Sequence, residues 1–391
     1  MNRTLLFISL FSILTLVSCQ SSPKNEAGKQ NEVELVAEKQ LAFPLDEQTY
    51  YLSKSMFQFE ENGKEYLHFE NTQKSLYDIV IFDIENKQIA KRIPLHKTGP
   101  NGLPAVYGSR PSPDSKQILI SQNNIGRLST INNQGEVVHN YPVKTPEGRF
   151  TTFFFCSYYN APAFVKDSCI FLNQGIFKPN MKREDWPQTH MFASQNLETG
   201  KFEWVPIFYP PIFKEEYENI DGGYGFSYDY NYKESRLVCG FFGYDSLMVT
   251  DDLKHIRWYN AKSKYLKSMK PKLGNAMAGI NSIIEFCEAP MYWHIMYDKY
   301  RDVYYRFAEM PYKLAPNESP YDEPKGKEFS VIVLNADFEI IGDTKFPGKK
   351  YFYKMSFVGK EGLYISENNL ANPQFDENKL VFTCFKIKNV P

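Results

Sequence analysis

Residues 56–95 constrain the fold more than any other stretch, because they hold four short runs in which apolar and polar side chains alternate. Polar clusters at residues 61–64, 71–74 and 85–87 separate these runs. Alternation with a period of two, bounded by turn residues, is typical of antiparallel strands. Four strands in roughly 40 residues match one blade of a β-propeller. One blade cannot bury both of its faces, so this stretch predicts neighbours of the same kind.

Two kinds of hairpin recur along the rest of the chain. An inner hairpin, with an entering strand, a polar turn and an apolar strand, begins at Phe57, Arg110, Pro162, Ser227, Ile295 and Met355. An outer hairpin follows five of these copies and begins at Leu76, Arg127, Met191, Leu247 and Ser330. The aromatic content of 16% fits this reading, because aromatic side chains favour pleated, half-buried surfaces.

The sixth copy lacks its outermost strand, since residues 380–387 supply a third strand and the chain ends at Pro391. Residues 33–45 are extended and amphipathic and precede the first copy. We expect them to pair with residues 380–387, because closing a ring removes exposed strand edges. The predicted fold is therefore all-β, a six-bladed β-propeller over residues 33–391 whose last blade is closed by the N-terminal strand. A five-bladed ring and a pair of β-sandwiches are the alternatives.

The amino terminus has the features of a processing signal. Arg3 precedes an apolar run at residues 5–16, which is too short to span a bilayer comfortably. The sequence Leu-Val-Ser-Cys at residues 16–19 resembles a bacterial lipobox, which implies cleavage after residue 18 and acylation of Cys19. We expect residues 19–32 to form a flexible tether from the membrane, and Gln20 resembles the outer-membrane default of lipoprotein sorting. The alternative is an ordinary secretory signal with an incidental cysteine.

Long connections fall on one side of the predicted ring. They cover residues 175–189, 206–225, 260–290 and 311–327, and each joins strand ends on the same face. Insertions in repeat proteins often build the binding face, although loop drift is an alternative because loop entropy rises slowly with length. The candidate residues for this face are Asn101, Arg110, Tyr158, Tyr159, Trp186 and His190. Residues 281–286 belong either to the third of these connections or to the next inner strand.

Four of these candidates have a structural alternative. Asn101 lies in a Gly-Pro-Asn-Gly turn that either shapes the chain or lines the rim. Arg110 starts an inner strand and is either a charge facing the pore or a solvated loop residue. Trp186 and His190 either stack on a ligand such as a sugar ring or pin their own loop by packing.

The sequence lacks the short motifs that carry common enzyme chemistry, including HExxH, the phosphate-binding P-loop, GxSxG and GxGxxG. Its six histidines have no ligand spacing. We therefore expect no cofactor, no metal site and no catalytic residue. The formal net charge of −1 does not indicate nucleic-acid binding. A non-catalytic module that binds a protein, peptide or glycan is expected, with a hydrolase or lyase using a pore-centred metal ion, or a structural envelope subunit, as alternatives.

The lipobox before a six-blade pattern, together with the sequence His-Lys-Thr-Gly-Pro-Asn-Gly at residues 96–102, resembles one known family. These are Bacteroidota lipoproteins grouped as domain of unknown function 4221, which more distantly resemble TolB-like six-bladed propellers. The resemblance covers roughly residues 33–391. It implies a propeller in the cell envelope and transfers no activity and no catalytic residues.

Overall fold

Short β-strands form nearly all of the regular structure in the described part of this computed structural model. The structure describes residues 32–71, 77–112, 114–122, 125–143, 154–155, 161–174, 187–212, 225–267, 269, 280–320 and 325–390. The chain divides into a unit of residues 1–31 and a unit of residues 32–391, and every described residue lies in the second unit. The predicted signal peptide and Cys19 lie outside the described residues.

The described strands form five sheets. The first sheet contains β2 (Met56–Glu61), β3 (Lys64–Asn71), β4 (Asp78–Asp83) and β5 (Gln88–Pro94). The second contains β6 (Gly108–Pro111), β7 (Ile118–Gln122), β8 (Arg127–Ile131) and β9 (Val137–Pro142). The fourth contains β15 (Phe226–Asn231), β16 (Arg236–Phe241), β17 (Ser246–Thr250) and β18 (Arg257–Asn260). In each of these sheets the strands follow chain order.

The third sheet has an additional strand that the sequence did not predict. It contains β10 (Phe154–Phe155), β11 (Phe164–Lys166), β12 (Cys169–Gln174), β13 (Phe192–Asn196) and β14 (Phe202–Trp204). Both β10 and β11 pair with β12, β10 at its end and β11 at its start. The innermost position of this sheet is therefore shared between two short strands.

The fifth sheet has eight strands and contains both ends of this unit. Its order is β19 (Met291–Asp298), β20 (Val303–Glu309), β21 (Phe329–Leu334), β22 (Ile340–Phe346), β1 (Val33–Pro44), β25 (Lys379–Asn389), β24 (Gly362–Ser366) and β23 (Phe352–Gly359). β1 and β25 run antiparallel, from Val33 opposite Asn389 to Pro44 opposite Lys379. The two segments that the sequence predicted to meet are thus paired. β1 meets β22 only at Val33 and Gly342.

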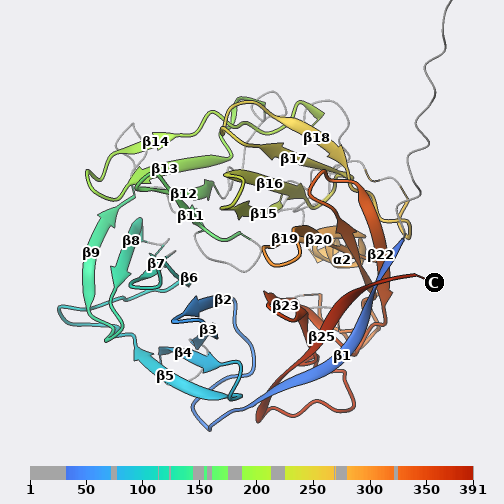
Figure 1. Cartoon of the computed structure of the whole chain (residues 1–391), viewed down its shortest axis with the longest axis horizontal. Coiled ribbons are helices and arrows are strands. Elements are labelled where there is room, and N and C mark those ends of the chain that lie inside the picture. The colour runs from blue at the N-terminus through green and yellow to red at the C-terminus, as the bar shows by residue number, and fades with distance from the viewer. Residues whose placement is uncertain are drawn as a thin grey trace, which may run out of the picture. The chain divides into compact units, whose positions relative to one another are not determined.

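The sheets are arranged around a common centre, so the predicted all-β, propeller-like arrangement is confirmed. Figure 1 shows β2, β6, β15, β19 and β23 nearest the centre, with β5, β9, β14, β18 and β1 at the periphery. Paired strands in these sheets are antiparallel, except for the parallel contact between β1 and β22 at Val33 and Gly342. All six predicted inner hairpins and all five outer hairpins are present as strand pairs.

Local sequence explains the tightest turns. Asn62 and Gly63 join β2 to β3 with φ angles of 51° and 78°, and Asp167 and Ser168 join β11 to β12 with 49° and 58°. Two consecutive positive φ angles define the type I′ turn, whose twist matches that of the flanking strands, and Asn-Gly is its preferred sequence. These turns fix the hairpin register and thus the side chains that face the centre.

Apolar side chains from successive groups of strands fill the spaces between them. The described residues form six such clusters. In one of them Phe192 of β13 meets Tyr228 of β15, with ring centroids 5.0 Å apart. In another, Phe43 of β1 lies 4.7 Å from the ring of Phe82 of β4. The hydrophobic core is therefore divided into several clusters, which lie between groups of strands around the centre.

One segment whose structure the sequence left open is a helix. Residues 281–286 lie in α2 (Ile280–Glu288), immediately before β19. The apolar residues Ile280, Ile283, Ile284 and Cys287 recur with helical spacing. The possibility that this stretch belongs to the next inner strand is therefore wrong. No helix among the described residues is both long and apolar enough to cross a membrane.

Candidate functional site

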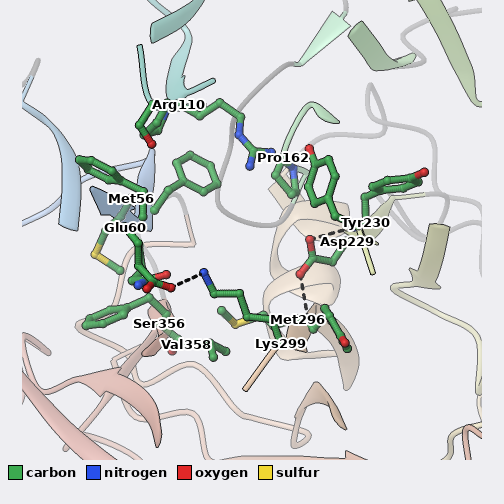
Figure 2. Close-up of a pocket in the computed structure, with 18 of the residues that line it drawn as sticks. Met56, Glu60, Arg110, Pro162, Asp229, Tyr230, Met296, Lys299, Ser356 and Val358 are labelled. Carbon is green, nitrogen blue, oxygen red and sulfur yellow. Dashed lines mark hydrogen bonds and ion pairs between the residues drawn. The ribbon is translucent and has the colours of Figure 1, made fainter. Parts of the chain in front are cut away.

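The centre of the second unit holds a cavity of about 520 Å³. The innermost strands β2, β6, β15, β19 and β23 all contribute to its wall (Figure 2). Ser112, Tyr232 and Lys299, which lie in or beside the turns after β6, β15 and β19, line one end. A cavity of this size and mixed polarity is typical of sites for small ligands.

Aromatic rings form much of the cavity wall. Phe57 and Phe59 come from β2, and Tyr230 and Tyr297 come from β15 and β19. The ring of Tyr230 stacks on Phe164 with centroids 4.4 Å apart. These neighbours hold the rings in place, so the wall is a formed surface of the kind on which planar or sugar-like groups stack.

Arg110 brings a positive charge into the cavity from β6. One guanidinium nitrogen, Nη1, donates to the carbonyl oxygen of Ala163, and Cζ lies 5.0 Å from the ring centroid of Phe57. Figure 2 shows the side chain reaching toward Pro162. Among the described residues no carboxylate lies within ion-pair distance of Arg110, whereas Arg92 pairs with Asp46 and Asp78.

Asp229 brings a negative charge from β15. Its Oδ1 accepts the N–H of Tyr230 at 2.8 Å, and its Oδ2 accepts the N–H of Tyr297 at 2.8 Å. Burial raises the pKa of Asp229 to about 6, although the two N–H donors and the charge of Arg110 act in the opposite direction. The carboxylate is therefore fixed in the cavity wall and costly to ionise.

The negative charge of Glu60, near the end of β2, is compensated by neighbouring side chains. Its Oε1 lies 2.8 Å from Nζ of Lys299 and accepts the hydroxyl of Tyr300 at 2.7 Å, and its Oε2 lies 3.1 Å from Nζ of Lys360. Hydrogen bonds from Lys299 and then Tyr300 lower the pKa of Glu60 to about 2. Figure 2 shows the pair between Glu60 and Lys299 within the cavity.

The described donors do not resemble a metal centre. Among the described residues no three His, Cys, Asp or Glu side chains are grouped so that they could hold a metal ion. Of the described residues that line the cavity, Glu60 and Asp229 carry carboxylates, and Glu60 is bound by two lysines.

Of the predicted binding-face residues that the structure describes, Asn101, Arg110 and His190, only Arg110 lines the cavity. Asn101 accepts the N–H of Val137 at 3.0 Å, within a turn in which Gly99 has a φ of 88°. His190 contacts the carbonyl oxygen of Val205 through Nδ1 at 2.7 Å and stacks on Trp204, with centroids 5.3 Å apart. The structure does not bring Asn101 or His190 into the cavity. Tyr158, Tyr159 and Trp186 lie outside the described residues.

Sequence reasoning missed Asp229 and Glu60. Asp229 lies between two tyrosines and is the one charged residue of the inner strand β15, as Arg110 is of the short inner strand β6. A charged residue within a predicted innermost strand is the sequence feature that could have indicated a side chain lining the central cavity. Glu60 gave no such signal, because it looks like an ordinary turn-flanking glutamate.

Comparisons with known proteins identify the family. The model described as Domain of unknown function (DUF4221) matches residues 32–345. The crystal structure of a DUF4221 member from Bacteroides vulgatus ATCC 8482 is similar, with 86% identity and a TM-score of 0.89, covering 93% of this chain and 100% of that one.

A second solved structure shares the fold alone. It is a Bacteroides fragilis NCTC 9343 protein described as a presumed exported protein, with 8% identity and a TM-score of 0.54, covering 94% of this chain and 98% of that one. The comparison with curated proteins finds no match. Because the family model covers most of its length, this chain belongs to the DUF4221 family.

Proposed function

We propose that this chain is a lipid-anchored envelope protein that binds a small or terminal part of a peptide, protein or glycan without transforming it. The observation that carries the proposal is the pair Arg110 and Asp229. Both line an aromatic cavity, and the described residues offer Arg110 no carboxylate partner. Opposite charges fixed in one cavity without pairing to each other are available to a ligand.

The proposed scaffold is a six-bladed propeller, with the eight-stranded sheet counted as two blades. One blade is β19 to β22, and the other is β23 to β25 completed by β1. Apolar residues from the two halves, such as Val331 of β21 and Phe385 of β25, share one cluster, as expected for blades packed face to face. The short contact between Val33 and Gly342 is then a junction between blades rather than a continuous ladder.

Polar contacts support the same count, because they link each proposed blade to the next around the ring. The pairs are His68 with Ser109, Arg110 with Ala163, Tyr232 with Val165, Lys233 with Asp302, Arg301 with Gly359, and Lys360 with Glu65. These six links return to the first sheet, which is what a closed ring of six requires.

The proposed location is the cell envelope, through acylation of Cys19 and a tether at residues 19–32. The lipobox supports it, and the Bacteroides fragilis protein of similar fold is described as presumed exported. Mass spectrometry of the mature amino terminus tests this part. An acylated cysteine as the first residue is expected, and an unmodified amino terminus upstream or downstream of Cys19 would contradict it.

The alternative of a hydrolase or lyase with a pore-centred metal ion is not favoured. Glu60 is engaged by Lys299 and Lys360, and Asp229 by two backbone N–H groups. The wider binding surface predicted from sequence, comprising Asn101, Tyr158, Tyr159, Trp186 and His190 beside Arg110, remains part of the proposal. Alanine substitutions at these positions test which of them contact a ligand.

Native mass spectrometry tests the proposed function. The full chain would be purified in detergent from the membranes of the cells that make it. A bound molecule is expected with the natural sequence and with the Lys91→Gln control, which removes an exposed charge from the outer strand β5. The molecule should be lost with Arg110→Gln. No bound mass in any sample, and no stabilisation by an envelope extract, would contradict the proposal.

A further inference from the structure

We infer that the ligand of the central cavity carries a carboxylate, held by Arg110, beside a hydrogen-bond donor held by Asp229. This inference rests on the proposed function and narrows it to a ligand class. Two sources share the chemistry. One is the end of a peptide or an amino acid, which has an ammonium or amide donor, and the other is an acidic sugar, which has hydroxyl donors.

The geometry of Arg110 supports the first part of this inference, a carboxylate on the ligand. A guanidinium presents five N–H donors in a planar fork that matches a carboxylate. Nη1 donates to Ala163, and the ring of Phe57 lies against the side chain, so the group is held while other donors remain open to the cavity. Arg236 and Arg301, by contrast, each have an aspartate partner in the protein. Arg110 is thus oriented for a partner that the described residues do not supply.

The geometry of Asp229 supports the second part of this inference, a hydrogen-bond donor beside that carboxylate. An ionised carboxylate offers about four lone-pair sites, and the N–H groups of Tyr230 and Tyr297 occupy one on each oxygen. These two bonds fix the orientation of the group without neutralising it. Capacity remains on both oxygens for a ligand donor.

The charge balance of the cavity selects among anions. Among the described residues, three cationic and two anionic side chains line it: Arg110, Lys233, Lys299, Glu60 and Asp229. Lys299 pairs with Glu60, and Lys233 pairs with Asp302 at 2.6 Å. Of these five charges, those of Arg110 and Asp229 remain without an ion-pair partner in the described part of the chain, and their sum is zero. A dianion such as phosphate would gain one arginine and be repelled by Asp229, whereas a single carboxylate with an adjacent donor satisfies both groups.

Matched ligand pairs test the inference by calorimetry on the full chain in detergent. One arm compares glycyl-phenylalanine with its carboxamide, and the other compares cellobiuronic acid with cellobiose. In at least one arm the acid is expected to bind roughly tenfold or more tightly than its neutral partner, since hydrogen bonds to charged groups are the strong ones. The arm that shows the preference identifies the source.

Variants locate the preference at the two residues. Arg110→Gln should abolish the preference for the acid, and Arg110→Lys should restore part of it. Asp229→Asn should weaken the acid at least severalfold, and Lys91→Gln should change nothing. Thermal melting would first establish that each variant is folded.

Each outcome bears on a different claim. Equal binding of acid and neutral members, unaffected by Arg110→Gln, overturns the inference and leaves the proposed binding function standing. Absence of binding in both arms overturns the inference for both sources. The proposed function falls only if native mass spectrometry and the envelope extract also give no ligand.

Discussion

Nζ of Lys299 lies 2.8 Å from Oε1 of Glu60, although 239 positions separate them in the chain. The hydroxyl of Tyr300 and Nζ of Lys360 also reach this carboxylate. Glu60 therefore ties the turn after β19 and the turn after β23 to the end of β2. Glu60 and Lys299 also line the central cavity, so this cluster links the contact between two sheets to the shape of the site.

Glu60→Gln should reduce stability in a pH-dependent way. The folded pKa of about 2 lies below the ordinary value of 4.5, so the stabilisation is present above about pH 4.5 and is lost as the pH falls toward 2. Because Glu60 is 31% exposed and Lys299 is 50% exposed, we expect about 1 kcal/mol at neutral pH. Denaturant unfolding of the natural sequence and of Glu60→Gln, from pH 2 to pH 7, measures this difference in the free energy of unfolding. A constant difference over this range would contradict the assignment.

His68, which is fully buried, and Asp229, in the cavity wall, should respond oppositely to acid. Burial lowers the pKa of His68 to about 3, with a smaller effect from Arg110, and burial raises the pKa of Asp229 to about 6. The contribution of His68 is complete above about pH 6.5 and is lost as the pH falls toward 3, at about 1.4 kcal/mol per unit. The contribution of Asp229 is complete below its ordinary value of 3.8 and is lost as the pH rises through 6.

Unfolding free energies between pH 4 and pH 6 distinguish the two groups. The stability of the natural sequence relative to His68→Gln should fall with acidification, and its stability relative to Asp229→Asn should rise. Parallel slopes for the two variants would show that one of these side chains is not buried as described.

Gly135→Ala should be far more damaging than Gly63→Ala. Both glycines have positive φ angles, 83° and 78°, so both substitutions carry the backbone penalty of about 1–2 kcal/mol. A Cβ at position 135 would lie 2.1 Å from the carbonyl oxygen of Pro94, whereas nothing lies within 4 Å of one at position 63. We expect Gly135→Ala to cost at least about 2 kcal/mol more. Equal melting temperatures would contradict the close contact between β5 and the turn before β9.

Phe43→Ala tests whether β1 is an integral strand. Phe43 has no exposed surface and lies against Phe82 in a cluster shared with β23 and β25. Truncating a buried phenylalanine typically costs about 3–5 kcal/mol. Glu34→Ala, on the exposed side of the same strand, should change stability by less than about 0.5 kcal/mol. Similar small effects of both variants would mean that β1 is not docked.

Much of the architecture was predictable from local sequence. Alternation between polar turns predicted the hairpins, and the turn between β2 and β3 has Asn62-Gly63, the preferred sequence for its type. The pairing of β1 with β25 was predictable for two reasons. The last predicted blade lacked its outermost strand, and the extended strand before the first blade had no other predicted partner. Helix α2 was not predictable with the same certainty, since a short apolar run such as that around Ile283 fits a strand or a helix.

The site was only partly predictable. Arg110 was a candidate because it begins an inner strand, but nothing local distinguished it from a solvated arginine. Asp229 and Glu60 lie 169 positions apart in the chain, and only the arrangement of the sheets around a common centre brings them to one cavity. Loop length pointed to the strand ends that lead into the long connections, whereas Ser112, Tyr232 and Lys299 line the cavity at the short turns. Which end admits a ligand depends on side-chain packing at the centre, which loop length does not report.

Hydrogen–deuterium exchange of the full chain, with and without the acidic compound that binds, tests the central claim most directly. The N–H groups of Tyr230 and Tyr297 donate to Asp229 in the cavity wall. Binding at the centre should slow exchange in the peptides that contain β15 and β19, and Arg110→Gln should remove this protection. Protection confined to the segments around Asn101 and His190, with β15 and β19 unchanged, would contradict a central binding site.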